Sequence, residues 1–375
     1  MKCIDALSEK ELLGKRVLVR GGLNVPVKNG IVVNDFRLRR IVMTLSFLKD
    51  RGARIILIGH IGRGGEESLK PAADSLRKFL PITFVPKTTG SEVIGAIESM
   101  KDGEVLLLEN LRKDPREEKN DSEFSKELAS YADVFVNDAF SASHRAHSSI
   151  VGVAEILPAY AGLVMKDEVE HLQKARSPKG PSLAIVGGSK FETKEHLIET
   201  LLGVYDHVFV TGALANDMFK AKGFEVGRSL VSDANPSAKV LDHEGVIIPI
   251  DVTAETKDGH GHVTKADNVV PDEKIVDIGP DTIAVLAPYI KNAKTILWNG
   301  PTGLYEGGYD QWTRTLATLV AKSDAFSIVG GGDTIATIQE EGLEEQFGFL
   351  STGGGAMLEF LLKGTLPGIE ALERN

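Results

Sequence analysis

The chain has a single cysteine, Cys3, among 375 residues. One cysteine cannot form an internal disulfide, and no second cysteine or adjacent base would activate its thiol, so we expect it to be structurally inert. The sequence also lacks any apolar run approaching the roughly 18 residues of a transmembrane helix, and its N-terminus lacks the apolar core of a signal peptide. These absences predict a cytoplasmic protein with no membrane partner.

Two common nucleotide-binding motifs are absent as well. The chain has no Walker A pattern, G-x-x-x-x-G-K-[ST]. It also has no G-x-G-x-x-G followed by an acidic residue about 20 positions later. A P-loop NTPase and a dinucleotide-dependent dehydrogenase are therefore both disfavoured.

Basic residues are in deficit, with 43 Lys and Arg against 53 Asp and Glu and a net charge of -10. This charge argues against nucleic acid as a partner, because phosphate backbones are bound by clustered Lys and Arg. The distribution is uneven, since residues 1–158 carry 24 basic and 22 acidic side chains and residues 159–375 carry 19 and 31. The asymmetry is compatible with an anion site in the first half.

Short apolar runs rich in β-branched residues recur between amphipathic stretches in both halves of the chain. Because they do not alternate apolar and polar residues, these runs are typical of strands buried on both faces of a parallel sheet. We therefore expect an α/β fold with two doubly wound, Rossmann-like domains. The runs lie at residues 16–20, 53–59, 104–110, 133–138, 182–188, 207–212, 245–251, 294–300 and 326–332.

The length of the chain and the restart of this strand pattern predict two domains, residues 1–158 and 159–354. Apolar residues recur at roughly helical spacing over residues 161–176, at the start of the second domain. We interpret this segment as a connector helix between the domains.

Basic side chains of the first half stand near predicted strand ends, where ligands bind in open α/β sheets. The planar guanidinium of arginine binds phosphate and carboxylate groups in bidentate fashion, so several converging arginines would hold a small polyanion. Unrelated surface arginines are the alternative, which fits any one of them better than it fits the group. The group comprises Arg20, Arg37, Arg63, Arg112, Arg145, His60, His144 and His147.

Three glycine-rich segments mark the second half, at residues 187–190, 330–334 and 351–356. Glycine lets backbone N–H groups approach phosphate oxygens, and a loop that enters a helix adds the positive end of the helix dipole. Each segment taken alone is weak support for phosphate binding.

Two possible metal sites can be weighed from the residues. Asp333 ends a predicted strand and begins a helix, so its carboxylate suits either a Mg²⁺ ligand or an N-cap, and both roles stay open. His260 and His262 have no third His or Cys near them in sequence, so we interpret residues 257–262 as a polar turn.

Eight segments resemble, in order, the hallmark segments of phosphoglycerate kinase along essentially the whole chain. A chance ordering of eight such segments is implausible. The segments are KRVLVR…LNVP at 15–26, GHIGR at 59–63, LLLENLR at 106–112, NDAFSASHRAHSS at 137–149, LAIVGGSKFETK at 183–194, ILWNGPTGLYE at 296–306, IVGGGDT at 328–334 and STGGGA at 351–356.

The resemblance implies reversible phosphoryl transfer between ATP and 3-phosphoglycerate, giving ADP and 1,3-bisphosphoglycerate, in glycolysis and gluconeogenesis. It implies Mg²⁺ bound with the nucleotide, phosphoglycerate in the first domain, nucleotide in the second, and a return of residues 355–375 to the first domain. We expect a monomer. Reactants held by different domains must be brought together by hinge closure, for which residues 161–176 and 351–355 are candidates.

The resemblance also assigns roles to residues of this chain. The substrate-binding residues would be Gly22, Leu23, Asn24, Arg37, His60, Ile61, Gly62, Arg63, Arg112 and Arg145. The nucleotide-binding residues would be Lys194, Glu306, Gly331, Gly332, Asp333 and Thr334, with Asp333 toward Mg²⁺.

The acceptor implied by the resemblance is a carboxylate, which is already ionised at neutral pH, so no general base is needed. Catalysis then reduces to alignment and charge neutralisation. Arg37, Lys190 and the backbone N–H groups of Gly354 and Gly355 are the catalytic candidates.

The chain departs from the family pattern at two places. Family members usually have an aspartate where this chain has Gly22, and we expect weaker substrate affinity or altered selectivity from its loss. Residues 211–216 replace a glycine-richer stretch near the expected adenine pocket, which leaves the nucleotide preference open. Two alternatives to the kinase also stay open: a non-catalytic nucleotide- or anion-binding paralogue, and a kinase of a related small carboxylic acid.

Overall fold

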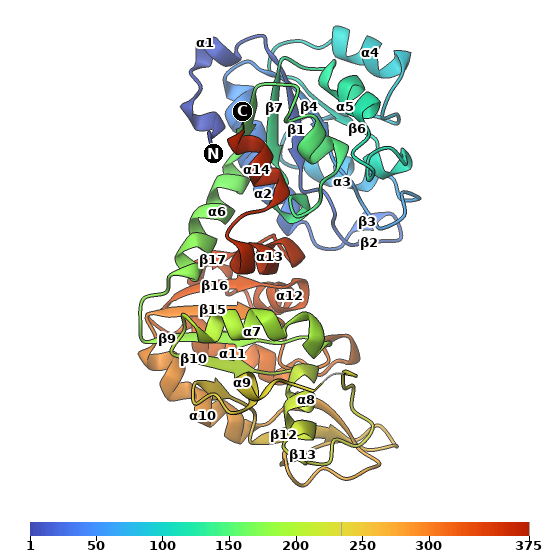
Figure 1. Ribbon diagram of the computed structural model, residues 1–375. Coiled ribbons are helices and arrows are strands. Elements are labelled where there is room, and N and C mark those ends of the chain that lie inside the picture. The colour runs from blue at the N-terminus through green and yellow to red at the C-terminus, as the bar shows by residue number, and fades with distance from the viewer. Residues whose placement is uncertain (234, 375) are drawn as a thin grey trace. The chain divides into compact units, whose positions relative to one another are not determined.

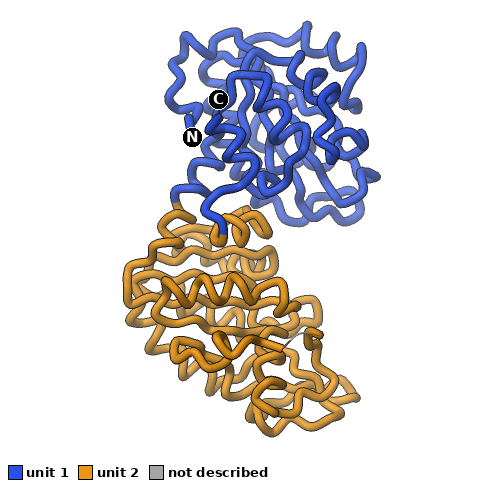
Figure 2. Tube along the Cα trace, viewed as in Figure 1, with its two compact units in different colours: residues 1–170, 363–375 blue, residues 171–362 orange. Residues whose placement is uncertain are grey.

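The computed structural model describes residues 1–233 and 235–374, which form two compact units (Figure 2). Unit 1 consists of Met1–Glu170 and the chain from Lys363 onward, and unit 2 of His171–Leu362. The chain thus leaves unit 1 within helix α6 (Leu163–Arg176) and returns within helix α13 (Gly355–Lys363) (Figure 1).

The two units divide later along the chain than residues 158 and 354, where the sequence analysis placed the domain ends. The physical reason at the first division is strand β8 (Ala159–Ala161), which pairs with β7 and adds an edge strand to the sheet of unit 1. Helix α6 begins two residues after the predicted start of the connector helix and ends at the predicted residue.

Unit 1 is built on a six-stranded parallel sheet with the order β5-β6-β4-β1-β7-β8. The central strands β1 and β4 each contain an apolar run that is buried on both faces, residues 17–19 and 55–58, as a sheet covered by helices requires. A short hairpin, β2-β3, lies outside this sheet. The strands are β1 (Arg16–Gly21), β2 (Val27–Lys28), β3 (Ile31–Val32), β4 (Arg54–Ile58), β5 (Thr83–Val85), β6 (Val105–Leu108), β7 (Val134–Asp138) and β8.

The longest of the helices that lie wholly in unit 1 is α2, whose apolar stripe of Leu38, Ile41, Leu45 and Leu48 is buried in the core beside β1 and β4. That spacing of three and four residues puts all four side chains on one face of the helix. The α-helices are α1 (Glu9–Leu12), α2 (Phe36–Asp50), α3 (Lys70–Leu76), α4 (Ser91–Glu98), α5 (Ser122–Ala129) and α14 (Pro367–Glu373). Single turns are η1 (Ile4–Ala6), η2 (Leu111–Lys113), η3 (Phe140–Ala142) and η4 (Ser148–Gly152).

Unit 2 repeats this plan with a second six-stranded parallel sheet, in the order β11-β10-β9-β15-β16-β17. Its strands β9 and β15 are completely buried. The strands are β9 (Ser182–Val186), β10 (His207–Val210), β11 (Val246–Ile247), β15 (Thr295–Asn299), β16 (Phe326–Gly330) and β17 (Phe349–Leu350). The helices are α7 (Glu195–Leu202), α8 (Ala213–Ala221), α9 (Ala238–Leu241), α10 (Pro280–Asn292), α11 (Gln311–Ala321) and α12 (Gly332–Glu340), with turns η5 (Phe191–Thr193), η6 (Tyr305–Gly307) and η7 (Glu344–Gln346).

A three-stranded antiparallel sheet also belongs to unit 2, in the order β13-β12-β14. Its strands are β12 (Asp251–Glu255), β13 (Gly261–Lys265) and β14 (Lys274–Ile278). The prediction of one parallel strand over residues 245–251 is wrong here, because the parallel strand ends at Ile247 and β12 begins at Asp251. The predicted polar turn at 257–262 leads from β12 into β13.

The expected fold class is confirmed, with two Rossmann-like parallel sheets. Each sheet has one topological switch point, where neighbouring strands are followed by connections that run in opposite directions. In unit 1 it lies between β1 and β7, and in unit 2 between β9 and β15. Ligands of open α/β sheets bind outside the carboxyl ends of the strands at such points.

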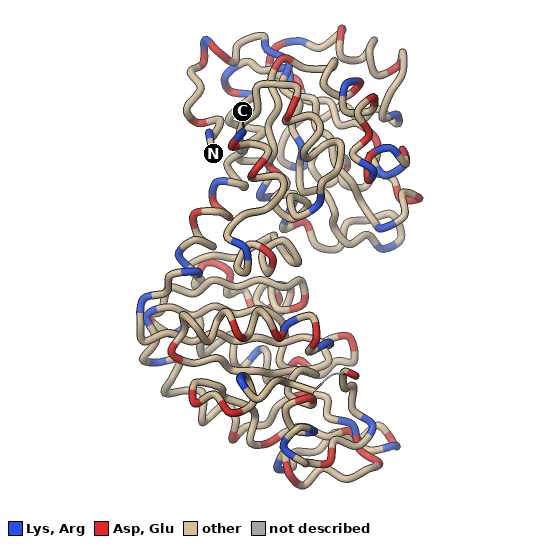
Figure 3. Tube along the Cα trace, viewed as in Figure 1, with Lys and Arg blue, Asp and Glu red and all other residues tan. Residues whose placement is uncertain are grey.

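Charged residues are distributed along both units (Figure 3). Among the described residues, no helix is long and apolar enough to cross a membrane. The Cys3 thiol is half-buried, and burial raises its pKa to about 11, so the thiol stays protonated at neutral pH.

Candidate active site

Basic side chains gather near the switch point of unit 1, on or beside the loops that follow β1, β4, β6 and β7, and we call this group the basic cluster. Within it, Arg20 is completely buried near the end of β1. Its NH2 group donates to Nδ1 of His60 at 2.8 Å, and its NH1 group donates to the carbonyl of Gly21 at 2.6 Å. Arg20 was part of the basic group seen in the sequence but was not assigned to the site.

Asn24 ties three of the predicted substrate residues together. Its carbonyl accepts from NH1 of Arg37 at 2.6 Å, and its side-chain oxygen accepts from the backbone N–H of Gly62 at 3.0 Å. The carbonyl of Gly62 in turn accepts from NH1 of Arg112. The loops after β1, β4 and β6 therefore meet at Asn24 and Gly62.

The remaining predicted residues of unit 1 have different surroundings. Arg145 has an exposed side chain, and its charge helps to lower the pKa of both His60 and Arg112, as does burial. Arg63 is exposed on the loop after β4. Leu23 and Ile61 have buried apolar side chains in the core of unit 1, so only their backbone is available to a ligand.

Asn110 lies beside the basic cluster, and sequence reasoning did not assign it a role. It is completely buried and its side-chain amide donates to the carbonyls of Ile61 and Glu67, both at 2.9 Å. Its side-chain oxygen accepts from the backbone N–H of Arg112 at 3.1 Å. Asn110 thereby connects the loop after β4 to the loop after β6. The one signal for this role in the sequence is that a polar residue closely follows a buried strand.

Gly22 lies beyond the carboxyl end of β1, inside the loop that carries Asn24. A Cβ atom built on Gly22 would find only Ser141 Oγ nearby, at 3.5 Å, which is ordinary van der Waals contact. The backbone therefore leaves room for a side chain at the position where the family usually has aspartate.

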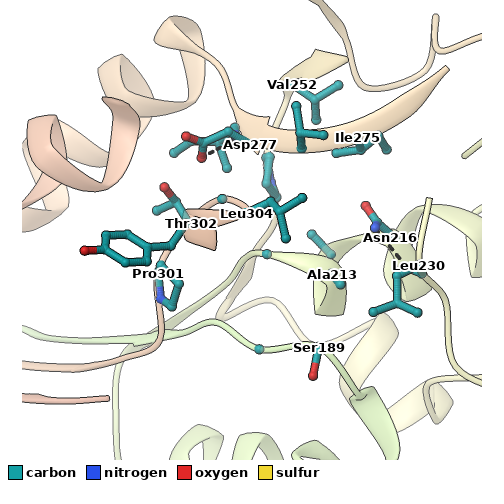
Figure 4. A pocket seen from close by; sticks show the side chains of 18 of the residues that line it. Ser189, Ala213, Asn216, Leu230, Val252, Ile275, Asp277, Pro301, Thr302 and Leu304 are labelled. Atoms are coloured by element: carbon teal, nitrogen blue, oxygen red, sulfur yellow. Dashed lines mark hydrogen bonds between the residues drawn. The ribbon is translucent and has the colours of Figure 1, made fainter. Parts of the chain in front are cut away.

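A cavity of about 470 Å³ lies in unit 2, beside its switch point (Figure 4). Figure 4 shows Val252 and Ile275 on one side and Ser189 on the other, with Leu304 between them. Its walls come from loops after β9, β10 and β15 and from the antiparallel sheet. The lining includes Gly188, Gly212, Ala213, Asn216, Pro301, Thr302, Gly303, Tyr305, Glu306 and Asp333.

The backbone segments that follow β9 and β15 are in close contact beside this cavity. The N–H of Gly187, after β9, donates to the carbonyl of Asn299, at the end of β15, at 2.8 Å. A Cβ on Gly300 would lie 2.5 Å from the carbonyl oxygen of Gly187, and Gly300 has a φ of 94°, which favours glycine. Both glycines are needed for the two strand ends to meet.

The two predicted lysines of unit 2 differ in environment. Lys194 donates from Nζ to the side-chain oxygen of Asn299 at 3.0 Å, and burial lowers the pKa of its ammonium group to about 8. Lys190 has an exposed side chain at the end of the loop that begins with Gly187 and Gly188. Its charge is thus available to a ligand, whereas that of Lys194 already has a polar partner.

Asp333 lies at the second position of α12, and Gly331 is the N-cap, so the alternative that Asp333 caps this helix is wrong. Its carboxylate lines the cavity together with Glu306. Burial and the charge of Glu306 raise the pKa of Asp333. Among the described residues, no group of three or more His, Cys, Asp or Glu side chains could hold a metal ion.

The other glycines named from the sequence stand at helix starts. Gly331 is the N-cap of α12 and Gly332 is its first residue. Thr334 follows in the first turn, and its buried Oγ1 has no hydrogen-bond partner among the described residues. Gly354, with a φ of 53°, leads into Gly355, the first residue of α13. A Cβ on Gly355 would have no atom within 4 Å, so its surroundings are open.

Of the unit 2 residues proposed from the sequence, Glu306 and Asp333 line this cavity. Its lining does not include Lys190, Lys194, Gly331, Gly332 or Thr334. Sequence reasoning did not assign the apolar wall, because Val252 and Ile275 belong to the antiparallel sheet, which no pattern in the sequence indicated.

A basic cluster at one switch point and a glycine-lined cavity with a carboxylate at the other are what an α/β phosphotransferase needs for its two anionic substrates. The family model for phosphoglycerate kinase matches residues 7–364. Among curated relatives, the phosphoglycerate kinase of Moorella thermoacetica is 44% identical over 98% of both chains, and that of Dictyoglomus turgidum is 42% identical over 99% of both.

Solved structures agree. The phosphoglycerate kinase of Coxiella burnetii has a TM-score of 0.80 and 37% identity over 97% of both chains. That of Pyrococcus horikoshii has a TM-score of 0.89 and 29% identity, covering 100% of this chain and 98% of that one. The chain belongs to the phosphoglycerate kinase family, and its activity is that of a kinase with a carboxyl group as phosphoryl acceptor. The family supports this activity over the two alternatives from the sequence.

Proposed function

We propose that the chain transfers a phosphoryl group reversibly between ATP and the carboxylate of 3-phosphoglycerate, with the acid bound in unit 1 and the nucleotide in unit 2. The observation that carries the proposal is the pair of switch points. One is lined by buried and exposed cations, and the other by glycine backbone and a cavity of about 470 Å³. A small polyanion suits the first, and a nucleotide suits the second.

The phosphoglycerate contacts are proposed from the basic cluster. Arg63 and Arg145 offer exposed guanidinium groups, and Arg112 offers a nearly buried one whose Nε pairs with Glu118 at 3.0 Å. Asn24, Arg37 and His60 complete the side-chain contacts, while Gly22, Leu23, Ile61 and Gly62 offer backbone groups. Because guanidinium groups bind both phosphate and carboxylate, the basic cluster suits a molecule that has both.

The nucleotide contacts are proposed from the cavity and the helix starts around it. Glu306 accepts from the ribose hydroxyls, and Lys194 donates to the phosphates. The backbone N–H groups of Gly331 and Gly332, with Thr334, bind phosphate at the N-terminus of α12, where the helix dipole is positive. The apolar side chains of Val252, Ile275 and Leu304 would cover the base.

Mg²⁺ bound with the nucleotide is part of the proposal, and Asp333 is its protein ligand. The residues fit this ion, because Mg²⁺ is commonly held by one or two carboxylates together with substrate phosphates and water. Burial, and after it the charge of Glu306, raises the pKa of Asp333 in the free protein, and a bound divalent cation would favour its ionised form. When bound, the ion supplies neutralisation of phosphate charge.

Arg37 and Lys190 are proposed to stabilise the moving phosphoryl group, assisted by the N–H groups of Gly354 and Gly355. The acceptor carboxylate is ionised at neutral pH, so these groups need only align the reactants and neutralise charge. We also infer a monomer, and a cytoplasmic location is consistent with a chain that has one cysteine.

A steady-state coupled assay with ATP, Mg²⁺ and 3-phosphoglycerate tests the proposal. We expect turnover that saturates in both substrates. Nucleotide binding without turnover would favour a binding protein, and faster turnover of another small acid in a panel would reassign the substrate.

The role of Lys190 is tested by Lys190→Ala, with exposed Lys222→Ala as the matched control. Because its charge is placed on the moving group, loss of Lys190 should lower kcat far more than it weakens ADP binding. Lys222→Ala should change neither. A large loss of ADP affinity with unchanged kcat would contradict the assigned role.

A further inference from the structure

A line of four buried polar side chains runs through unit 1 from Glu117 to His60. Glu117 accepts from both the backbone N–H of Ser149, at 3.0 Å, and its hydroxyl, at 2.5 Å. Ser149 Oγ accepts from Nε of Arg20 at 2.9 Å, and NH2 of Arg20 meets Nδ1 of His60 at 2.8 Å. Glu117, Ser149 and Arg20 are completely buried, and His60 is 8% exposed.

The direction of each hydrogen bond in this line is fixed by chemistry. A guanidinium group has only donors, so Nδ1 of His60 must be the acceptor in its bond with Arg20. A neutral imidazole that accepts at Nδ1 carries its proton on Nε2. Among the described residues, no hydrogen bond occupies Nε2, so its proton is available to a ligand.

The carboxylate at the other end compensates a buried charge. Burial lowers the pKa of Arg20, because an unpaired guanidinium is costly in a low-dielectric interior, and the charge of Glu117 opposes this by favouring the ionised form. The serine between them donates its one hydroxyl proton to Glu117, which leaves its lone pairs to receive Arg20. Removing Glu117 would thus loosen the arginine that holds the histidine.

We propose that Glu117 is a positioning residue for the anion site, which acts through Ser149 and Arg20 to hold His60 as the neutral tautomer protonated on Nε2. His60 then presents an N–H donor to a phosphate or carboxylate oxygen of the bound acid. This last step rests on the proposed function, because it takes His60 as a substrate contact. Glu117 and Ser149 act indirectly, since neither is placed against substrate.

The charges around His60 agree with a neutral ring. Burial lowers the pKa of His60 most, and the neighbouring charges of Arg20, Arg112, Arg145 and His147 lower it further. Nδ1 of His147 lies 3.8 Å from Oε1 of Glu117. Burial lowers the pKa of His147 itself to about 4. A second proton on His60 would also set two donors, at Nδ1 and Arg20, against each other.

Nitrogen NMR of the histidine rings in the free enzyme tests the tautomer directly. A His60→Gln sample identifies the His60 signals among the nine histidines. We expect Nδ1 to show the shift of an unprotonated ring nitrogen and Nε2 that of a protonated one, without titration between pH 6 and pH 8. A proton on Nδ1, or a fully protonated ring at pH 7, would overturn the proposal.

Two variants then test the source of the tautomer. Glu117→Gln keeps the side-chain shape but removes the charge. Ser149→Ala is a smaller change that interrupts the same hydrogen-bonded line, and it serves as the second test if Glu117→Gln folds poorly. In both, we expect His60 to lose its single tautomer and the KM for 3-phosphoglycerate to rise about tenfold, with the KM for ATP nearly unchanged. Unchanged His60 signals in both variants would contradict the proposal.

Asp206→Asn is the matched control, because Asp206 also accepts from the N–H and hydroxyl of one serine, Ser182, at 2.8 Å each. In that pair the Ser182 hydroxyl oxygen accepts from the backbone N–H of Asp206, at 3.0 Å, where Ser149 accepts from Arg20. The His60 signals and both KM values should therefore stay as in the natural chain. The NMR result does not depend on turnover. An enzyme with the expected His60 tautomer and no turnover would count against the proposed function alone.

Discussion

At the scale of single residues, Gly22 offers the most direct test of the acid site. Its place in the loop after β1 has room for a side chain, since the nearest atom to a built Cβ is 3.5 Å away. We expect Gly22→Asp to lower the KM for 3-phosphoglycerate roughly tenfold or more, because a carboxylate hydrogen bond to the substrate hydroxyl is worth about 1.5–3 kcal/mol. Steady-state kinetics at fixed ATP would measure it.

The control for that substitution is Gly22→Asn, which has the same shape without the charge. The amide should give a smaller gain, since hydrogen bonds to charged groups are the stronger ones. If Gly22→Asp raised the KM, repulsion of the anionic substrate would outweigh the new bond, and the proposed orientation of the acid at Gly22 would be wrong.

Lys194 predicts a pH dependence of nucleotide binding. Burial lowers the pKa of its ammonium group to about 8, and a phosphate contact favours the charged form. ADP affinity should therefore be highest below pH 8 and should fall as the pH rises through 8 toward 10, because binding must then restore the lost proton. Titration calorimetry at pH 7 and pH 9, without Mg²⁺, would show weaker binding and proton uptake at the higher pH.

Lys194→Arg serves as the comparison, since a guanidinium group keeps its charge over this range. Its ADP affinity should be nearly independent of pH between 7 and 9. Equal affinity of the natural chain at both pH values, without proton uptake, would show that Lys194 does not contact phosphate as a cation.

The same scale shows what the sequence could supply for the sites. Asn24 and His60 could be proposed from the sequence because they closely follow predicted strands and their chemistry is visible there. Glu306 lies in η6, well beyond the end of β15, and its role was implied by the family resemblance. Ser149 and Glu117 could not be proposed, since their partnership with Arg20 depends on loops that are far apart along the chain.

At the scale of secondary-structure elements, the approach of β9 and β15 depends on Gly300. Gly300→Ala should destabilise unit 2 by about 1–3 kcal/mol beyond its backbone cost, because its Cβ would overlap the Gly187 carbonyl. ADP affinity should fall as well, since these strand ends border the cavity. Urea unfolding followed by tryptophan fluorescence reports on unit 2 alone, because Trp298 and Trp312 both lie there.

Gly259→Ala isolates the backbone cost of that change. Gly259 also has a positive φ, 79°, but a Cβ there would meet no atom within 4 Å. This variant should lose only about 1–2 kcal/mol, the cost of a left-handed conformation. Equal destabilisation by the two substitutions would mean that the contact with Gly187 relaxes without cost.

Strands could be predicted from the sequence where burial on both faces of a sheet requires a continuous run of apolar residues. Most strands of the two parallel sheets contain such a run, β1 and β9 among them. The antiparallel sheet was not predicted, because β13 is largely exposed and its sequence resembles that of a polar loop. Edge strands β8 and β17 are only three and two residues long, too short to give a pattern.

At the scale of the whole molecule, the end of the chain completes unit 1. Leu366, which directly precedes helix α14, and Leu372, within it, are both buried. The N–H of Gly368 donates to the carbonyl of Ser143 at 2.9 Å. Ser143 Oγ in turn accepts from the amide of Asn137, at the end of β7, at 3.1 Å. The C-terminal segment therefore supports the strand that borders the acid site.

Deleting residues 363–375 should abolish turnover by destabilising unit 1, because the deletion exposes the apolar surface that α14 covers. Unit 2 keeps every residue of its cavity, so ADP should still bind and the tryptophan unfolding transition should stay near that of the full chain. Deleting only residues 374–375 should leave turnover intact, since Arg374 is exposed. Loss of ADP binding in the longer deletion would show that unit 2 depends on unit 1 for its own fold, whereas retained binding with lost turnover would assign the two substrates to separate units.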